Sequence, residues 1–280
     1  MTPEQRYFFD LTGYLHIPNA LSPDELSAAQ EAAERYLKTP DDEMPPGFRI
    51  DRERTHFVWH FFGFAFDKAL ERLSRHPSFW PVVLELMHDR PRLTSGNLMI
   101  NHHEHEFHPL HSQREGTGTR GPEAPYYLTN KESIFCDHLV VFVYLTDVHP
   151  GDGGLIVVPG SHKSEFDRPE EYFYPGSRSP DGGYSPDYRS FDVPAGISNI
   201  TPKAGDVAMF VSDIWHRRMP TSDEDSGRFF LQVHYARRDI AQRLRRTAEV
   251  NHVSPQAIAR IKSDREKALL GLHLPKFYDG

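Results

Sequence analysis

A histidine at the end of an apolar segment is the residue best placed for chemistry in this sequence. Residues 205–216 (GDVAMFVSDIWH) form a turn, an apolar strand and then His216, and Arg228 follows twelve positions later. Imidazole is a common ligand of divalent transition metals, and a guanidinium binds a carboxylate through two parallel hydrogen bonds. The pattern predicts a divalent metal at the mouth of a small β-barrel, with a carboxylate cosubstrate held beside it.

A second source of imidazole lies far upstream. Residues 101–111 (NHHEHEFHPLH) hold five histidines, separated from His216 by most of a domain. Ligands of a zinc finger are close together in sequence, so these two sites can share a metal only if a sheet folds back on itself. Only some residues of a strand face inward. His102, His103, His105 and His108 are therefore expected at the surface or around the ligands.

Helices at the N-terminus must support these strands. Ser22 and Glu25 form a capping box around Pro23, which predicts the start of a helix whose apolar residues continue to Leu37. A second helix is expected around residues 69–73 and should end before Pro77. A third is expected around residues 79–87.

From Leu93 onward the pattern changes to short strands separated by turn residues. Residues 139–145 are continuously apolar, which indicates a strand buried on both faces. Residues 155–158, 207–211 and 229–235 give further strands, so the set favours a barrel or a double-sheet jelly roll. Residues 164–200 are rich in Pro, Gly and Tyr, and this composition favours a lid over the site. A terminal helix is expected after Ser254 and Pro255.

Composition excludes several classes of protein. The chain has 280 residues, and its net charge of −8 argues against nucleic acid as a partner. Cys136 is the only cysteine, so no internal disulfide can form, and its apolar neighbours favour a buried thiol. No secretory signal opens the chain, and no apolar stretch approaches the roughly 20 residues of a membrane span. These features predict a cytoplasmic protein.

Several segments together resemble the phytanoyl-CoA dioxygenase family. They are residues 137–148 (DHLVVFVYLTDV), 151–155 (GDGGL) and 158–163 (VPGSHK), with 9–14 (FDLTGY), 21–26 (LSPDEL) and 204–210 (AGDVAMF) leading to His216. The similarity covers roughly residues 5 to 238. Each motif alone is weak, whereas the PGSHK run and the spacing of AGD, His216 and Arg228 are specific in combination.

This resemblance implies a double-stranded β-helix (jelly roll, cupin-like) that binds Fe(II), 2-oxoglutarate and O2. In such enzymes two histidines and one carboxylate hold the iron and leave three positions open. His216 matches the distal histidine of the family, and Arg228 matches the arginine that binds the far carboxylate of 2-oxoglutarate. His111 follows Pro109 and Leu110, as the first histidine ligand of the family does.

The third ligand departs from the family pattern. The family places an acid two residues after the first histidine, where this chain has Gln113, whose amide oxygen is a weaker and uncharged ligand. Three explanations stay open: Gln113 or water takes the position, a nearby acid such as Glu104 or Glu115 supplies it, or the site is poor in iron or inactive.

The sequence thus predicts one domain over residues 1–280, mainly β with flanking helices. Its core spans roughly 90–238, with helical supports at 1–89 and 239–280 and the lid at 164–200. The predicted function is a dioxygenase that hydroxylates a small-molecule C–H bond while 2-oxoglutarate is decarboxylated to succinate. Arg217 and Arg218 follow His216 and could meet an anionic substrate. The alternative is a β-helix binding protein that has lost iron chemistry. Specificity is expected in residues 112–133 and in the lid.

Overall fold

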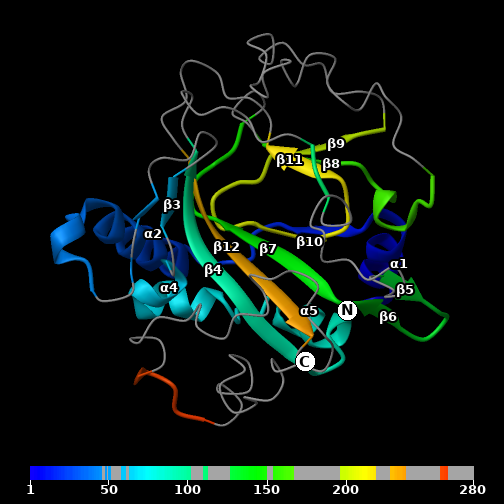
Figure 1. Ribbon diagram of the computed structural model, residues 1–280, viewed down its shortest axis with the longest axis horizontal. Coiled ribbons are helices and arrows are strands. Elements are labelled where there is room, and N and C mark those ends of the chain that lie inside the picture. Colours follow the sequence, from blue (N-terminus) through cyan, green and yellow to red (C-terminus); the bar gives the residue numbers. More distant parts are fainter. Residues whose placement is uncertain are drawn as a thin grey trace.

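Two antiparallel sheets face each other in this protein (Figure 1). The computed structural model describes residues 1–45, 48, 50–51, 58–60, 63–101, 110–112, 127–149, 154–166, 196–218, 228–237 and 259–263. The strands are β1 (Tyr14–Ile17), β2 (Ile50–Asp51), β3 (Val58–His60), β4 (Pro91–Asn101), β5 (Tyr127–Thr129), β6 (Ile134–Cys136), β7 (His138–Tyr144), β8 (Leu155–Val157), β9 (Ser198–Ile200), β10 (Val207–Val211), β11 (His216–Arg218) and β12 (Arg228–Arg237). The major sheet has the order β1-β10-β7-β12-β4-β3-β2, the minor sheet the order β11-β8-β9, and β5 pairs with β6.

The described helices pack around the major sheet, with α1 at one end near β5 and β6 (Figure 1). They are α1 (Pro3–Thr12), α2 (Pro23–Lys38), α3 (Gly63–Phe66), α4 (Lys68–Leu73) and α5 (Trp80–Leu86), with 3-10 turns at Asp41–Glu43 and Ser161–Lys163. The predicted start of α2 is confirmed, because the Ser22 side chain accepts from the Glu25 backbone and the Glu25 side chain accepts from the Ser22 backbone. The amphipathic face of α2 then buries Ala29, Ala33 and Tyr36 against the core.

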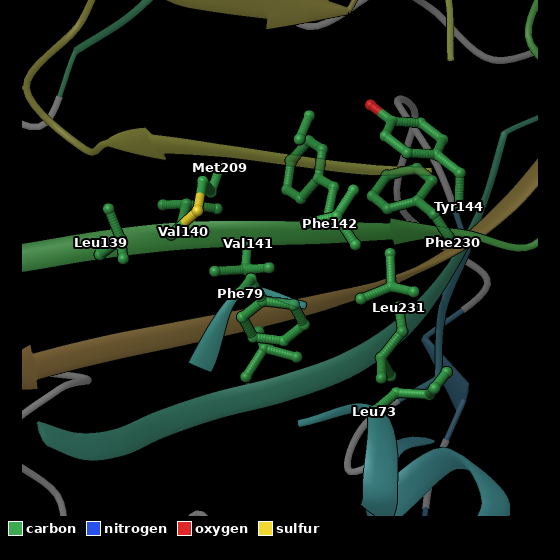
Figure 2. Packing of buried hydrophobic residues seen from close by; sticks show 14 of the residues in the cluster. Leu73, Phe79, Leu139, Val140, Val141, Phe142, Tyr144, Met209, Phe230 and Leu231 are labelled. Atoms are coloured by element: carbon green, nitrogen blue, oxygen red, sulfur yellow. The ribbon is translucent and has the colours of Figure 1, made fainter. Parts of the chain in front are cut away.

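Side chains of β7 alternate between two environments, as a period of two requires. All seven of its residues are buried, which confirms the prediction of a strand covered on both faces. Phe142 and Tyr144 point towards the minor sheet together with Phe230 of β12, whereas Val141 and Leu231 point towards Phe79 and the helices (Figure 2). The major sheet therefore has an outer face packed on helices and an inner face that looks into the space between the sheets.

The N-terminal motif and the PGSHK motif pack against each other. Lys163 Nζ donates to the carbonyl oxygen of Asp10 at 2.6 Å, and the Tyr127 hydroxyl donates to the Asp10 carboxylate at 2.9 Å. Gly13 ends α1 in the left-handed region with φ 83°, and a Cβ there would lie 2.5 Å from Nδ1 of His162. These contacts join α1 to the PGSHK motif, although the two segments are remote in sequence.

The contact between Gly13 and His162 gives a stability prediction. Gly13→Ala should lower the free energy of unfolding by about 2–4 kcal/mol, because it combines left-handed strain with a steric clash. Gly196→Ala is the matched control, since Gly196 has φ 90° but nothing within 4 Å of the added Cβ, and should cost about 1 kcal/mol. Urea unfolding of both variants measures the difference, and equal losses would contradict the proposed clash.

Several expectations change in detail. The fold class is confirmed as a mainly β, double-stranded β-helix, but segment 1–89 also supplies strands, because β1 pairs with β10 and β3 pairs with β4. Helix α4 ends at Leu73, before Pro77, where the Ser74 hydroxyl donates to the Glu71 carbonyl. Cys136 is buried and makes no disulfide.

Much of the predicted lid and the predicted C-terminal helix lies outside the described residues. Within the described part of the chain, no helix is long and apolar enough to cross a membrane.

Candidate metal centre

The two histidines singled out from remote parts of the sequence lie next to each other. His111 and His216 form an isolated antiparallel bridge, in which the His111 amide donates to the His216 carbonyl at 3.0 Å and the His216 amide donates back at 2.9 Å. Their ring centroids are 4.2 Å apart at an interplanar angle of 53°. The imidazoles are therefore close enough for nitrogens of both rings to reach one ion.

The His216 ring is held in one orientation. Its Nδ1 lies 2.8 Å from the carbonyl oxygen of Ile214, which can only accept, so Nδ1 carries the proton. The neutral tautomer then has its lone pair on Nε2, the arrangement that a metal-binding histidine adopts when its other nitrogen donates to a carbonyl. His216 is only 8% exposed, and its ring centroid lies 4.7 Å from that of Phe210 of β10. The ring therefore lies between the two sheets.

Hydrogen bonds fix the turn that leads into β11 and carries His216. The Trp215 amide donates to the hydroxyl of Ser161, in the PGSHK motif, at 2.8 Å. The Ser112 hydroxyl donates to the Asp213 carbonyl at 2.8 Å. Because these bonds come from two other segments, the residues next to His111 and the PGSHK motif both hold the backbone around His216.

Arg228 begins β12 in the major sheet, where its backbone pairs with Asn101 of β4. The next described strand after β11 is β12, and the two strands belong to different sheets. The chain crosses from the minor to the major sheet between the two residues. The side chain of Arg228 lies outside the described part of the structure.

Arg217 lies on the other face of β11 from His216. Its cross-strand partner on β8 is Ile156, which is buried but is not part of the main hydrophobic core. The residues on either side of Ile156 belong to that core, so Ile156 and Arg217 lie on the face that points away from it. Burial lowers the pKa of the Arg217 guanidinium to about 9, so the side chain stays protonated at neutral pH. The substrate role predicted for Arg217 and Arg218 stays a prediction.

Comparison with known proteins identifies the family. The family model of phytanoyl-CoA dioxygenase (PhyH) matches residues 9–224, most of the chain. The chain belongs to this family. The fold and the cofactors expected from the sequence, Fe(II), 2-oxoglutarate and O2, are those of the phytanoyl-CoA dioxygenase family, so the chain is a member of the Fe(II)/2-oxoglutarate-dependent class of enzymes. No curated protein matches the chain.

Solved structures share the fold at low sequence identity. HygX from Streptomyces hygroscopicus, with nickel and 2-oxoglutarate bound, is 21% identical and superposes with a TM-score of 0.66 over 85% of this chain and 87% of that chain. SnoK, a non-haem α-ketoglutarate-dependent carbocyclase from nogalamycin biosynthesis, is 20% identical with a TM-score of 0.61 over 91% and 92%. SnoN, an epimerase from the same biosynthesis, is 17% identical with a TM-score of 0.57 over 84% and 83%. Proteins that share the fold of this phytanoyl-CoA dioxygenase family member thus catalyse different reactions.

The candidates for a third metal ligand in this family member, Gln113, Glu104 and Glu115, all lie outside the described residues. Among the residues that are described, no group of three or more His, Cys, Asp or Glu side chains could hold a metal ion. The three explanations for the position of Gln113 therefore stay open.

The sequence reading missed a group of polar residues on the inner face of the major sheet. Gln232 and His234 alternate along β12 with Leu231, Val233 and Tyr235, which are fully buried. In the sequence this alternation covers residues 231–235 (LQVHY). The alternation predicts a strand, but one sequence segment does not show which face looks into the site.

Proposed function

We propose that this protein is an Fe(II)/2-oxoglutarate-dependent dioxygenase that hydroxylates a C–H bond of a small molecule. The observation that supports this most is the contact between His111 and His216, whose rings lie 4.2 Å apart although the residues are remote in sequence. Membership of the phytanoyl-CoA dioxygenase family supplies the class of chemistry. Solved relatives bind small molecules: HygX was crystallised with hygromycin B and SnoN with nogalamycin RO.

The described residues suit a divalent iron. Two neutral imidazoles are suitable ligands for Fe(II), and the bond from Nδ1 of His216 to Ile214 leaves the lone pair of the ring on Nε2, which would bind the metal. Bound iron with 2-oxoglutarate and O2 would supply the oxidising power for an unactivated C–H bond, with succinate as coproduct. In this proposal His111 and His216 hold the metal, and the Arg228 guanidinium binds the far carboxylate of 2-oxoglutarate through a bidentate pair.

The proposal also accounts for the aromatic inner face. Phe142, Phe210 and Phe230 lie together at the centre of the sheet. The ring centroid of Phe142 is 5.3 Å from that of Phe210 and 4.7 Å from that of Phe230. Such a surface keeps water away from the reacting centre and strengthens the interactions that hold charged groups there.

The third ligand can be tested by one substitution. Gln113→Asp should raise the affinity for Fe(II) about tenfold if residue 113 contacts the metal, because a carboxylate adds a negative charge to the ligand set. Anaerobic titration of the metal-free protein with Fe(II) measures the change. An unchanged titration curve would place Gln113 away from the metal and favour an acid from elsewhere.

A binding protein without iron chemistry is the second candidate, and the presence of Gln113 in place of an acid favours it. Anaerobic Fe(II) with 2-oxoglutarate should give a weak visible charge-transfer band if the oxygenase proposal is right. Under O2 the same sample should form succinate. Absence of both signals would favour the binding protein.

Hydroxylation is the proposed outcome rather than ring closure or epimerisation. Mass spectrometry of a turned-over substrate distinguishes the outcomes, since hydroxylation adds one oxygen atom, ring closure removes two hydrogens and epimerisation leaves the mass unchanged. A product without added oxygen would reject the hydroxylase assignment and retain the oxygenase class.

A further inference from the structure

Four polar side chains form a patch on the inner face of the major sheet. Ser95 and Asn97 of β4 pair directly with His234 and Gln232 of β12, so the four residues make two neighbouring cross-strand pairs. The Asn97 amide donates to the Ser95 hydroxyl at 2.9 Å. We call this group, Ser95, Asn97, Gln232 and His234, the polar patch.

The patch faces the minor sheet. Phe230 lies on the inner face with Phe142 and Tyr144 (Figure 2), and a period of two puts Gln232 and His234 on that same face. Val233 and Tyr235 alternate with these two residues and face the helices. There the centroid of the Tyr235 ring lies 5.8 Å from that of the Trp80 ring of α5.

Solvent reaches the patch although β4 and β12 are interior strands of the sheet. On the helix face of these strands Leu98, Leu231 and Val233 are completely buried. On the inner face Ser95 and Gln232 keep partial exposure. In the part of the chain that the structure describes, the Gln232 amide has no hydrogen-bond partner. Gln232 is partly exposed, so a ligand hydroxyl can supply this partner.

The patch also lies at the level of the candidate metal ligand. Val140 of β7 pairs with Phe210 on one side and with His234 on the other. Because neighbouring strands are about 4.8 Å apart, His234 lies about 10 Å across the sheet from Phe210, the residue that packs on the His216 ring. Arg228 begins β12, six residues before His234. The proposed 2-oxoglutarate site therefore lies near the start of this strand, and the patch lies further along it.

The chemistry of the patch identifies a class of ligand. Amide and hydroxyl groups each donate and accept hydrogen bonds and carry no net charge. A hydroxyl group of a ligand also donates and accepts, so it can satisfy them. An acyl chain would give the Gln232 amide no hydrogen bond, and a site that binds hydroxyls discriminates strongly against ligands that lack them.

We propose that the polar patch binds the substrate and that the substrate is a neutral, hydroxyl-rich small molecule such as a glycoside or cyclitol. This inference rests on the proposed oxygenase function and adds the substrate class to it. It also differs from the anionic substrate suggested by Arg217 and Arg218 in the sequence.

The test uses the protein loaded with Fe(II) and 2-oxoglutarate. Succinate formation is measured with neutral hydroxyl-rich probes (sucrose, methyl glucoside and myo-inositol) and with octanoyl-CoA as the acyl probe. At least one hydroxyl-rich probe should raise succinate formation above the probe-free rate, whereas octanoyl-CoA should not. Stimulation by octanoyl-CoA alone, or by none of the probes, would overturn the proposal.

A matched pair of variants locates the binding surface. Gln232→Leu should raise the half-saturating concentration of the stimulating probe about tenfold, the effect of one lost hydrogen bond to a covered group. Gln30→Leu is the control, because the Gln30 side chain donates to the Leu145 carbonyl from α2, outside the space between the sheets. Equal effects of the two variants would reject the patch as the binding surface.

The charge-transfer band separates this proposal from the oxygenase proposal. The band is recorded for each protein before the probes are added, so loss of the metal site is recognised on its own. If the unmodified protein lacks the band, the oxygenase proposal fails. The patch is then tested by the shift of thermal midpoint that the hydroxyl-rich probes cause in the metal-free protein, and the absence of any shift would overturn it.

Discussion

His216→Ala should abolish iron binding and, with it, succinate formation. Removal of one of two imidazole ligands should lower the affinity for Fe(II) by more than about a hundredfold, since even the loss of a group that only supports a ligand costs 10–100-fold. Anaerobic titration with Fe(II) and 2-oxoglutarate, followed through the charge-transfer band, measures the loss. His111→Ala should have the same effect, because the two rings lie 4.2 Å apart and would share one ion.

The control for His216 is a histidine in the same protein that serves only the fold. His16 of β1 contacts the Asp206 carboxylate at 2.9 Å, and that carboxylate also accepts from the Asn19 and Lys203 amides. His16→Ala should therefore reduce thermal stability and retain iron binding. Full iron occupancy in His216→Ala would show that the ligand assignment is wrong.

Arg228→Ala should weaken 2-oxoglutarate binding far more than iron binding. In the proposed role of Arg228 the substitution would remove two charge-assisted hydrogen bonds to a carboxylate, so the KM for 2-oxoglutarate should rise about a hundredfold or more. Arg228→Lys keeps the charge and loses the planar fork, and it should raise the KM about tenfold. Succinate formation at varied 2-oxoglutarate concentration measures both effects.

Arg237 provides the matched control for Arg228 because it is the same residue type at the other end of β12. Its guanidinium lies over the Phe135 ring, 5.0 Å from the centroid, and away from the start of the strand. Arg237→Ala should leave the KM for 2-oxoglutarate within about twofold of its original value. A large rise in Arg237→Ala, or none in Arg228→Ala, would move the 2-oxoglutarate site to another part of the barrel.

Local sequence chemistry was sufficient for several elements. The capping box at Ser22 and Glu25 uses residues three positions apart, so the start of α2 depended on nothing outside that turn. The continuous apolar run of β7 likewise showed burial on both faces, because a strand exposes alternate residues to alternate faces. Family motifs added the expectation of iron, 2-oxoglutarate and the roles of His111, His216 and Arg228.

Boundaries and partners between strands were harder to predict. The sequence shows that Arg228 follows His216 by twelve residues, but it does not show that β11 joins the minor sheet and β12 joins the major one. Sequence spacing gives the length of chain between two residues, but the sheet that a strand joins depends on backbone pairing with remote segments. For the same reason the sequence does not show that Gln232 and His234 form one polar surface with Asn97 and Ser95, which come from a remote strand.

The sequence by itself determined the strand segments, the capped helix and the residue types suited to an iron site, because each depends on near neighbours in the chain. Only the tertiary structure decided that His111 meets His216, that the PGSHK motif holds Trp215 through Ser161, and that Asn97 stands opposite Gln232. These contacts join residues that are remote in the chain. They arise from strand register and sheet closure, which are set by hydrogen bonding and packing of the whole domain rather than by any local segment.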